Sequence, residues 1–437
     1  RFFGHREVMV RNAIRILTLD IYKVVYGAMA EIRDCEALQR FVLDRSRETY
    51  FIHLACHLRE LWFRLDAAGG VEHVVRDAID SHMDLLEFLS EVVGLGKEPL
   101  SKALVERLFR YALFPVLLGS LLDADDAAGK VDPLGAEADA TGSTPPQAPR
   151  PGRLSRRCAL FVAHQVFDAF RSAKVVLEPF AAVLLLPRPP PALLRFCLDD
   201  PPEAPPTYRT TSPGVCGPSS AEAASVAPQD DGSEDEDIWE LVAQALGEDE
   251  DTASSSSSGE TRCVRSCLLA QLHSSEDACV LLTVGVLTAC LSCREVLPES
   301  LKHRCGLLPR HCHTAHSFAL TPGAHAPDDS PDDSPDSPRG CTNGEAEVLL
   351  LVVQALERSL HMLRIVVVHA LVRLALEIAA DPAVSGCPAC CAAPTEAARR
   401  ALRAAARHVR SKMDGELADG FLDVFSEEWE QDKSPLM

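Results

Sequence analysis

Apolar residues recur at steps of three and four positions through most of this chain, which is the spacing of an amphipathic helix. Two such runs lie near the start of the chain, and each predicts a helix. The first is Val10, Ala13, Ile14, Leu17, Ile21 and Val24; the second is Phe51, Leu54, Ala55, Leu58, Leu61, Trp62 and Leu65. The same spacing predicts helices over residues 71–93, 101–122, 157–187, 263–297, 347–380 and 395–413. Alternation typical of strands is almost absent, so the pattern predicts an all-α fold.

Several of these helices are apolar on more than one side. Such a helix needs neighbours on two sides, as in stacked helical hairpins. The pattern therefore favours an α-solenoid of armadillo or HEAT type over a compact bundle, although no repeat of fixed period is visible.

Three stretches interrupt the helical pattern: residues 123–156, 199–261 and 318–346. They are rich in Pro, Ser, Gly, Asp and Glu, and they hold too little apolar surface to offset chain entropy. We expect disordered acidic linkers there. The helical blocks that remain are residues 1–122, 157–198, 262–317 and 347–437.

The acidic charge is concentrated in these linkers. The 437 residues carry a formal net charge of −21, with −5 in residues 123–148, −15 in residues 199–260 and −6 in residues 318–347. The predicted helical part is therefore mildly basic and has no large basic stripe of the kind that nucleic-acid binders show. We expect no nucleic-acid partner.

The 16 cysteines are scattered through apolar helical runs, which favours a reduced, cytosolic setting over a disulfide scaffold. The longest uncharged apolar run, residues 278–293, has 16 residues, whereas roughly 20 are needed to cross a bilayer. Any membrane contact should be peripheral. Because the chain begins at Arg1, we expect its natural start to lie upstream.

The segment HRCGLLPRHCHTAH and the later CPACC hold the residues with zinc-ligand chemistry. These are Cys305, His311, Cys312, His313 and His316, followed by Cys387 and Cys390. The two groups do not stand at a recognised finger spacing, so loop residues without a metal are the favoured interpretation, and no cofactor is expected. A zinc site shared between them is the alternative.

The chain shows none of the catalytic signatures of hydrolases, P-loop proteins, zincins, dinucleotide-binding enzymes or kinases. Its acidic pairs lie mostly in the linkers, where no rigid element would hold them in place. We therefore expect that the protein is not an enzyme.

The run DDSPDDSPDSP places Ser330, Ser334 and Ser337 each before a proline. Such serines suit proline-directed kinases, and a solvated spacer is the alternative. The predicted helix from Thr395 carries a basic series, which suits anionic lipid, a solvated face or the chain's own acidic linkers. This series is Arg399, Arg400, Arg403, Arg407, Arg410 and Lys412.

One tryptophan stands in the most acidic linker, where aromatic residues are unexpected. Trp239 and Val242 are three residues apart and follow the acidic run Glu234, Asp235, Glu236, Asp237. As an extended strand, the segment could join a partner's sheet edge. It resembles the aromatic-x-x-aliphatic motif that binds the ubiquitin-like proteins of autophagosome membranes. The alternative is a docked amphipathic helix with one apolar face: Ile238, Leu241, Val242, Ala245 and Leu246.

The opening stretch RFFGHREVMVRNAIRILTLDIYKV closely resembles the FPL-domain family, which includes the fly endosomal-maturation protein (ema), a human relative with a C-type-lectin name and plant transparent testa nine. Matching positions are Phe2, Phe3, His5, Glu7, Met9, Val10, Arg11, Arg15, Leu17, Leu19, Tyr22, Lys23 and Val24. The segment LVERLFRYALFPVLLGSL is similar to the family's Pro-containing signature, with Phe114 and Pro115 followed by Val116 in place of Leu. LFVAHQVFDAF and DGFLDVFSEEWE resemble two further family segments.

The resemblance implies an armadillo-like helical scaffold in endosome, Golgi and lysosome trafficking and in autophagy, located in the cytoplasm and peripherally on those membranes. It implies trafficking and autophagy proteins as partners and brings no active-site residues. Because animal relatives have been linked to ubiquitin ligases, a ubiquitin-ligase component, with zinc at Cys305, Cys312, Cys387 and Cys390, is the alternative function.

Overall fold

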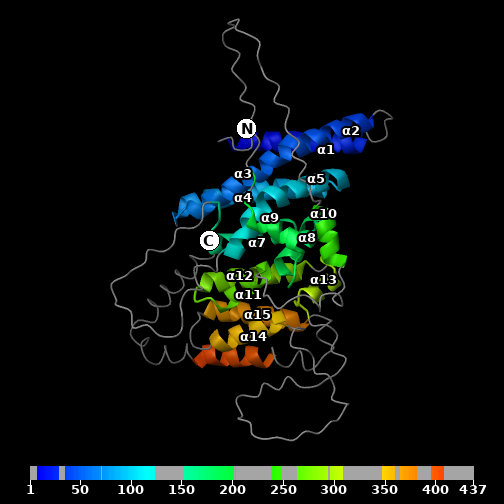
Figure 1. Ribbon diagram of the computed structural model, residues 1–437. Coiled ribbons are helices and arrows are strands. Elements are labelled where there is room, and N and C mark those ends of the chain that lie inside the picture. The colour runs from blue at the N-terminus through cyan, green and yellow to red at the C-terminus, as the bar shows by residue number, and fades with distance from the viewer. Residues whose placement is uncertain are drawn as a thin grey trace, which may run out of the picture.

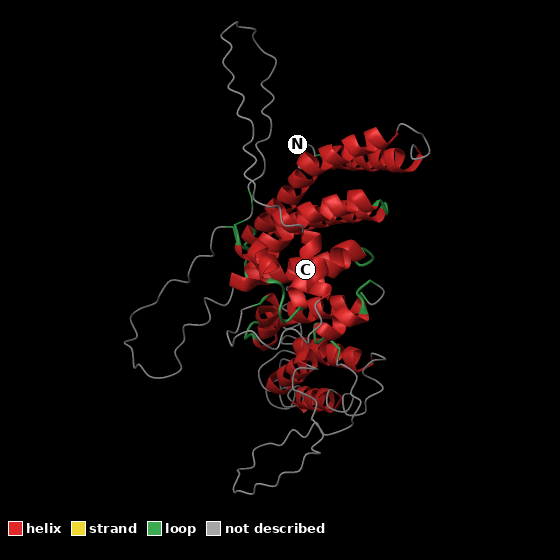
Figure 2. Ribbon diagram, turned by 45° about the vertical axis from the view of Figure 1, so that its right-hand side comes forward, coloured by secondary structure: helices red, strands yellow, loops and turns green. Residues whose placement is uncertain are grey.

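The computed structural model describes residues 7–28, 35–69, 71–123, 152–200, 202, 238–247, 263–293, 296–308, 347–359, 365–380 and 395–407. Within these ranges the chain forms helices and their connections, and no strand occurs (Figure 2). The predicted all-α fold class is confirmed. The acidic run Glu234–Asp237, the serines Ser330, Ser334 and Ser337, and the residues Phe2, Phe3 and His5 lie outside the described ranges.

The N-terminal half is built from long helical runs that change from α to π geometry without a break. Helix α1 (Val8–Lys23) continues into the π-helix η1 (Val24–Ala28). One run contains α2 (Cys35–Arg45), η2 (Ser46–Tyr50) and α3 (Phe51–Ala67), and it is followed by α4 (Glu72–Gly94). A second run contains α5 (Glu98–Leu108), the π-helix η3 (Phe109–Leu118) and α6 (Gly119–Asp123).

Shorter helices form the rest of the described chain. They are α7 (Arg156–Ala169), α8 (Lys174–Leu185), α9 (Pro191–Leu198), α10 (Ile238–Gly247), α11 (Val264–Ala270), η5 (Gln271–His273), α12 (Asp277–Ser292), α13 (Glu299–Arg304), α14 (Glu347–Ser359), α15 (Ile365–Ala380) and a helix over residues 395–407.

Figure 1 shows these helices in successive layers, from α1 and α2 at one end to α14, α15 and residues 395–407 at the other. Within this stack α3 packs on α4 and α5, while α12 lies between α7 and α15. Buried side chains from Leu19 to Ala401 form one continuous core. The layering explains why several helices are apolar on more than one side: each inner layer is covered by neighbours above and below.

Two of the predicted long helices are broken, which corrects the sequence-based boundaries. Residues 157–187 divide at the turn between α7 and α8, where the N–H of Ala173 donates to the carbonyl of Phe170 at 2.7 Å. Residues 263–297 divide before α12, where Ser274 Oγ accepts the N–H of Glu276 at 3.1 Å and Glu276 is extended. Serine competes for backbone groups in this way, and the competition favours a turn over a helix interior.

A third correction concerns the predicted linker 199–261, because α10 lies inside it. Ile238, Val242 and Ala245 stand at helical spacing and are buried against the stack. A composition-based prediction of disorder misses such a segment because its neighbours are acidic while its own apolar residues find a surface elsewhere in the fold.

Helix α12 packs closely on α7. A Cβ built on Gly285 of α12 would lie 3.1 Å from Cδ2 of His164 on α7, tighter than most real Cβ contacts. The absent side chain therefore lets the two helices approach, and α12 is held against α7 on one side and α15 on the other.

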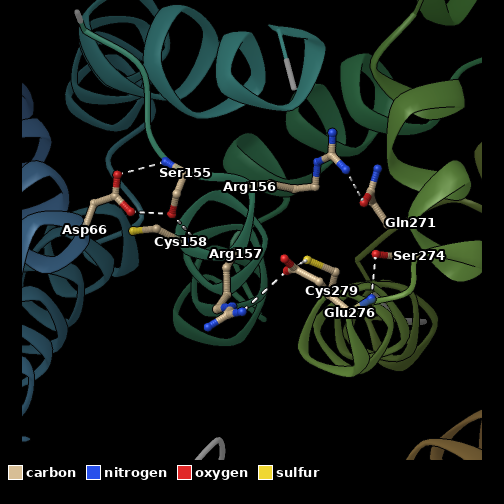
Figure 3. Close-up of polar contacts among 9 residues, drawn as sticks. All are labelled: Asp66, Ser155, Arg156, Arg157, Cys158, Gln271, Ser274, Glu276 and Cys279. Atoms are coloured by element: carbon tan, nitrogen blue, oxygen red, sulfur yellow. Dashed lines mark hydrogen bonds and ion pairs between the residues drawn. The ribbon is translucent and has the colours of Figure 1, made fainter. Parts of the chain in front are cut away.

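A polar network ties the starts of α7 and α12 to the end of α3 (Figure 3). Asp66 accepts hydrogen bonds from the backbone N–H of Ser155 at 2.8 Å and from the Ser155 hydroxyl, which in turn accepts the N–H of Cys158 and caps α7. Arg156 Nη1 donates to Gln271 Oε1 at 3.0 Å. The network fixes the first turn of α7 between two layers.

The carboxylate of Glu276 completes this network at the N-terminus of α12. Its Oε2 lies 3.2 Å from Cys279 Sγ and 3.4 Å from Arg157 Nη2. The hydrogen bond from Cys279 and the charge of Arg157 lower the pKa of Glu276. Burial, then the Glu276 carboxylate, raise the pKa of the Cys279 thiol to about 11, so this cysteine is a neutral donor.

Candidate partner-binding site

Helix α10 contains Trp239 and Val242, the two apolar residues of the predicted hook. It lies beside α8 and α9 on the side of the stack (Figure 1). We call the surface formed by α8, α9, Phe109 and Arg304 the α10 seat. The structure thus shows the docked-helix alternative; the extended conformation that a strand-adding hook requires is not the conformation of residues 238–247 here.

One face of α10 points into the seat. Ile238, Val242 and Ala245 are 0%, 4% and 3% exposed, and they follow one another at steps of four and three. Ala243 and Gln244 lie on the exposed side. Because burial of apolar surface is the main favourable term in docking, these three side chains contribute to the attachment together with the partly buried Trp239. Leu241 is partly buried against the same core, while the side chain of Leu246 lies outside the described set.

Trp239 joins α10 to the segment that carries the family signature. Its ring centroid lies 6.2 Å from that of Phe109, with the planes at 57°. Phe109 in turn stacks on Phe114, with centroids 4.7 Å apart and planes at 6°. Trp239 is only partly buried, so one part of the indole faces the seat and another part faces solvent.

A charged side chain from another layer holds the last turn of α10. Arg304 Nη2, at the end of α13, donates to the carbonyl oxygen of Ala245 at 2.6 Å. The carbonyls at the end of a helix lack partners within it and attract cations. Arg304 therefore fixes the position along the seat at which α10 ends.

The signature residues Phe114 and Pro115 belong to η3, the π-helix that also carries the seat residue Phe109. In η3 the N–H of Gly119 donates to the carbonyls of Phe114 and Val116, which leaves the carbonyl of Pro115 between them without that donor. Arg153 Nη1 supplies the hydrogen bond instead. Removing a donor from a buried carbonyl costs about 1–3 kcal/mol, so the hydrogen bond from Arg153 contributes to the stability of η3.

Arg153 also links η3 to its neighbours. Its Nε donates to Asp123 Oδ2 at 2.9 Å, and its Nη2 donates to the carbonyl of Leu198, at the end of α9, at 3.1 Å. A Cβ on Gly119 would clash with the Arg153 guanidinium and with the carbonyl oxygen of Cys197. The guanidinium thus fills the space that this glycine leaves, and it fixes α9 relative to η3.

The other described signature residues make structural contacts at the first layer. The hydroxyl of Tyr22 lies 2.9 Å from Ser46 Oγ, and burial raises its pKa to about 12. Arg11 and Arg15 approach Asp84 of α4 at 3.8 and 3.5 Å. Lys23 lies 3.8 Å from Asp20.

Met9, by contrast, is 83% exposed on α1, and Val10 is half-buried. Ile16, Leu17, Phe41 and other large apolar residues of α1 and α2 are exposed with it.

The predicted zinc ligands divide between described and undescribed parts of the chain. Cys305 is buried at the end of α13, and burial raises the pKa of its thiol to about 12. His311, Cys312, His313, His316, Cys387 and Cys390 lie outside the described ranges. Among the residues that the structure does describe, no group of three His, Cys, Asp or Glu side chains could hold a metal ion.

The basic C-terminal series is described as far as residue 407. Arg399, Arg400, Arg403 and Arg407 are exposed, and Arg399 lies 3.9 Å from Glu396. Arg410 and Lys412 lie outside the described ranges. Within the described part of the chain, no helix is both long and apolar enough to cross a membrane.

Sequence reasoning missed Phe109, Arg153 and Arg304, which position α10 and its seat. Arg153 stands in a proline-rich stretch inside the predicted linker 123–156, and Arg304 ends a short basic helix. No local pattern indicates that Arg153 binds the carbonyl of Pro115, 38 residues away, or that Arg304 binds the carbonyl of Ala245, 59 residues away. A proline inside a helical apolar run, as at Pro115, marks a missing N–H and so an unsatisfied carbonyl about one turn earlier; it gives no sign that its own carbonyl is the one that Arg153 contacts.

Comparison with known proteins supports the resemblance seen in the sequence. Human CLEC16A is 29% identical over 131 residues, which cover 29% of this chain and 12% of that protein. The Drosophila homolog of CLEC16A is 30% identical over 130 residues, or 28% of this chain and 11% of that protein. Arabidopsis TRANSPARENT TESTA 9 is 25% identical over 146 residues, or 31% of this chain and 16% of that protein.

The chain is related to CLEC16A and TRANSPARENT TESTA 9 over this part of its length. The match spans about an eighth of human CLEC16A, so most of that relative has no counterpart in the alignment. No family model matches the chain. No solved structure matches it either.

Proposed function

We propose that this protein is a non-enzymatic scaffold in endosome, Golgi and lysosome trafficking and in autophagy, and that it acts through protein contacts. The observation that carries the proposal is the relationship to CLEC16A and TRANSPARENT TESTA 9. The resemblance of the opening stretch and of the Phe114–Pro115 segment to the FPL-domain family supplies the trafficking role.

The arrangement of the helices supports a scaffold. Apolar layers stack along one direction, as expected of an armadillo-like or HEAT-like α-solenoid, and such stacks offer long surfaces to partners. Enclosed polar groups have partners within the stack: the half-buried Arg153 binds the carbonyls of Pro115 and Leu198, and the buried His82 accepts from Trp62. We assign them structural roles, and we place the protein in the cytoplasm and on the surface of these membranes.

Partners are expected to reach the chain through short segments as well as through the stack. Trp239 and Val242 are proposed to bind a ubiquitin-like autophagy protein, and ubiquitin ligases are proposed as a second class of partner. The alternative, a zinc-containing ligase component, stays a prediction because all its candidate ligands except Cys305 lie outside the described ranges.

The proposal is tested by expressing the tagged full chain in cultured human cells in which CLEC16A has been disrupted. Two readouts are taken: co-fractionation with endosome, Golgi and lysosome membranes, and lysosomal turnover of a lipidated autophagy marker with and without a lysosomal inhibitor. We expect membrane association and an altered turnover rate. A Gly285→Leu chain, in which the packing of α12 on α7 is disturbed, is the negative control, because it shows whether the two readouts require the correctly folded stack.

A chain that is expressed and folded, yet stays off these membranes and leaves turnover unchanged, would contradict the proposed function.

A further inference from the structure

Docking of α10 uses the same groups that an extended-segment partner would need. Val242 is 4% exposed because it faces the α10 seat, and Trp239 packs against Phe109. A segment that adds to a partner's sheet edge pairs its backbone N–H and carbonyl groups with that edge. In α10 the backbone is helical, and the carbonyl of Ala245 accepts from Arg304. One molecule of α10 therefore cannot be docked and paired with a sheet at the same time.

The attachment of α10 is of a kind that can be reversed. A helix of ten residues is marginal by itself in water, so the helical state of residues 238–247 depends on the seat. The buried side chains are few and lie on one face: Ile238, Val242 and Ala245. Residues 203–237 and 248–262 connect α10 to its neighbours, and stretches of this length allow it to leave its seat without displacing α9 or α11.

We propose that α10 is a displaceable helix whose docking on its seat withholds Trp239 and Val242 from a partner that binds an extended segment. Release of α10 opens two interaction surfaces together: the segment itself and the α10 seat. The partner class rests on the proposed function. The competition between docking and partner binding rests on the described contacts alone.

The alanines of α10 give a matched pair of variants. Ala245 is 3% exposed in the seat, whereas Ala243, two residues earlier, is exposed to solvent. Ala245→Asp places a carboxylate on the buried face of α10, close to Arg304, and should release the helix because the cost of desolvating a charge exceeds what a single ion pair returns. Ala243→Asp adds the same charge to the same helix and should leave it docked.

The test measures affinity for a ubiquitin-like autophagy protein by titration. The ligands are a peptide of residues 228–252, the full chain, and the full chain with each substitution. We expect the wild-type chain to bind at least tenfold more weakly than the peptide, Ala245→Asp to approach the peptide, and Ala243→Asp to match the wild-type chain. As a control for direct effects of the new charge on partner binding, each substitution is also made in the peptide. The two substitutions should change the affinity of the peptide equally.

Hydrogen exchange of residues 238–247 supplies the second readout. Their amides should exchange faster by at least tenfold in Ala245→Asp, with protection of α7 and α12 unchanged, which separates release from unfolding. Equal affinity of the wild-type chain and the peptide would overturn the proposal. So would a peptide that fails to bind, because docking would then withhold nothing; the trafficking scaffold would still stand or fall by its own experiment.

Discussion

Helices α12 and α10 are both apolar and both belong to the same core, yet they are held in different ways. Helix α12 is an inner layer, enclosed by α7 and α15, with Gly285 close to His164 and Glu276 tied into the polar network at its start. Helix α10 lies on the side of the stack, with one buried face and its last turn held by Arg304. Enclosure on two sides makes a helix part of the cooperative unit, whereas docking on one side leaves it free to open locally.

The largest effect should come from filling the α7–α12 contact. Gly285→Leu would push a branched side chain into His164 and should lower the free energy of unfolding by about 3 kcal/mol, at the upper end of overpacking costs. Urea unfolding followed by circular dichroism measures this. Gly27→Leu is the control, because a Cβ there meets nothing within 4 Å. Equal stability of the two variants would show that α12 is not tightly enclosed.

Acid should weaken the layered part of the fold through His82, which is fully buried between α3 and α4. Trp62 Nε1 donates to its Nδ1 at 3.1 Å, so the neutral ring is the form that fits, and burial lowers its pKa from 6.5 to about 4. Between these two values the unfolded chain binds a proton that the folded chain excludes. Stability from this residue is therefore complete above pH 6.5 and falls as the pH drops towards 4, by about 1.4 kcal/mol per unit.

Between pH 7 and pH 4.5 the free energy of unfolding of the wild-type chain should fall by about 2–3 kcal/mol through His82. This fall should be absent in His82→Gln, because glutamine can accept the hydrogen bond from Trp62 and does not titrate. Urea unfolding at both values is the measurement. His73→Gln, at an exposed histidine of the same helix, is the matched control. An identical pH dependence in His82→Gln and in the wild-type chain would refute the assignment.

A smaller and local effect is expected at α10. Arg304→Met removes the donor to the Ala245 carbonyl and should destabilise docking by about 1.4 kcal/mol, which is a tenfold rise in hydrogen exchange of residues 238–247. The melting temperature of the stack should change little. Arg76→Met, at a mainly exposed arginine on α4, gives the baseline. If α12 exchanged faster along with α10, the two helices would belong to one cooperative unit and the comparison would fail.

The smallest effect belongs to the ion pair on the surface of the α7–α12 junction. Arg157 and Glu276 are 63% and 57% exposed and 3.4 Å apart, and such pairs contribute about 0.5 kcal/mol or less. Arg157→Ala should therefore change stability by no more than that, and the difference should vanish at high salt. A loss above about 1.5 kcal/mol would mean that the polar network, and not the apolar packing, holds α12.

The positions of helices could largely be predicted from the sequence, because helical periodicity is a local property. The runs in α1, α3 and α4 match their expected spans closely. The breaks at Phe170–Ala173 and Ser274–Glu276 escaped prediction, since apolar spacing continues across them while turn hydrogen bonds decide the backbone. The linker prediction failed at α10 for a different reason: its burial depends on a seat formed by distant residues.

The sequence by itself determined the all-α class, the apolar faces and the identity of the candidate residues Trp239 and Val242, because these follow from the order of side chains. It left two conformations open for residues 238–247, extended hook and docked helix. Only the tertiary structure decided between them, by bringing α8, α9, Phe109 and Arg304 to one surface. It also assigned Arg153 to the Pro115 carbonyl and buried His82, since a partner far along the chain is fixed by how layers pack and not by local spacing.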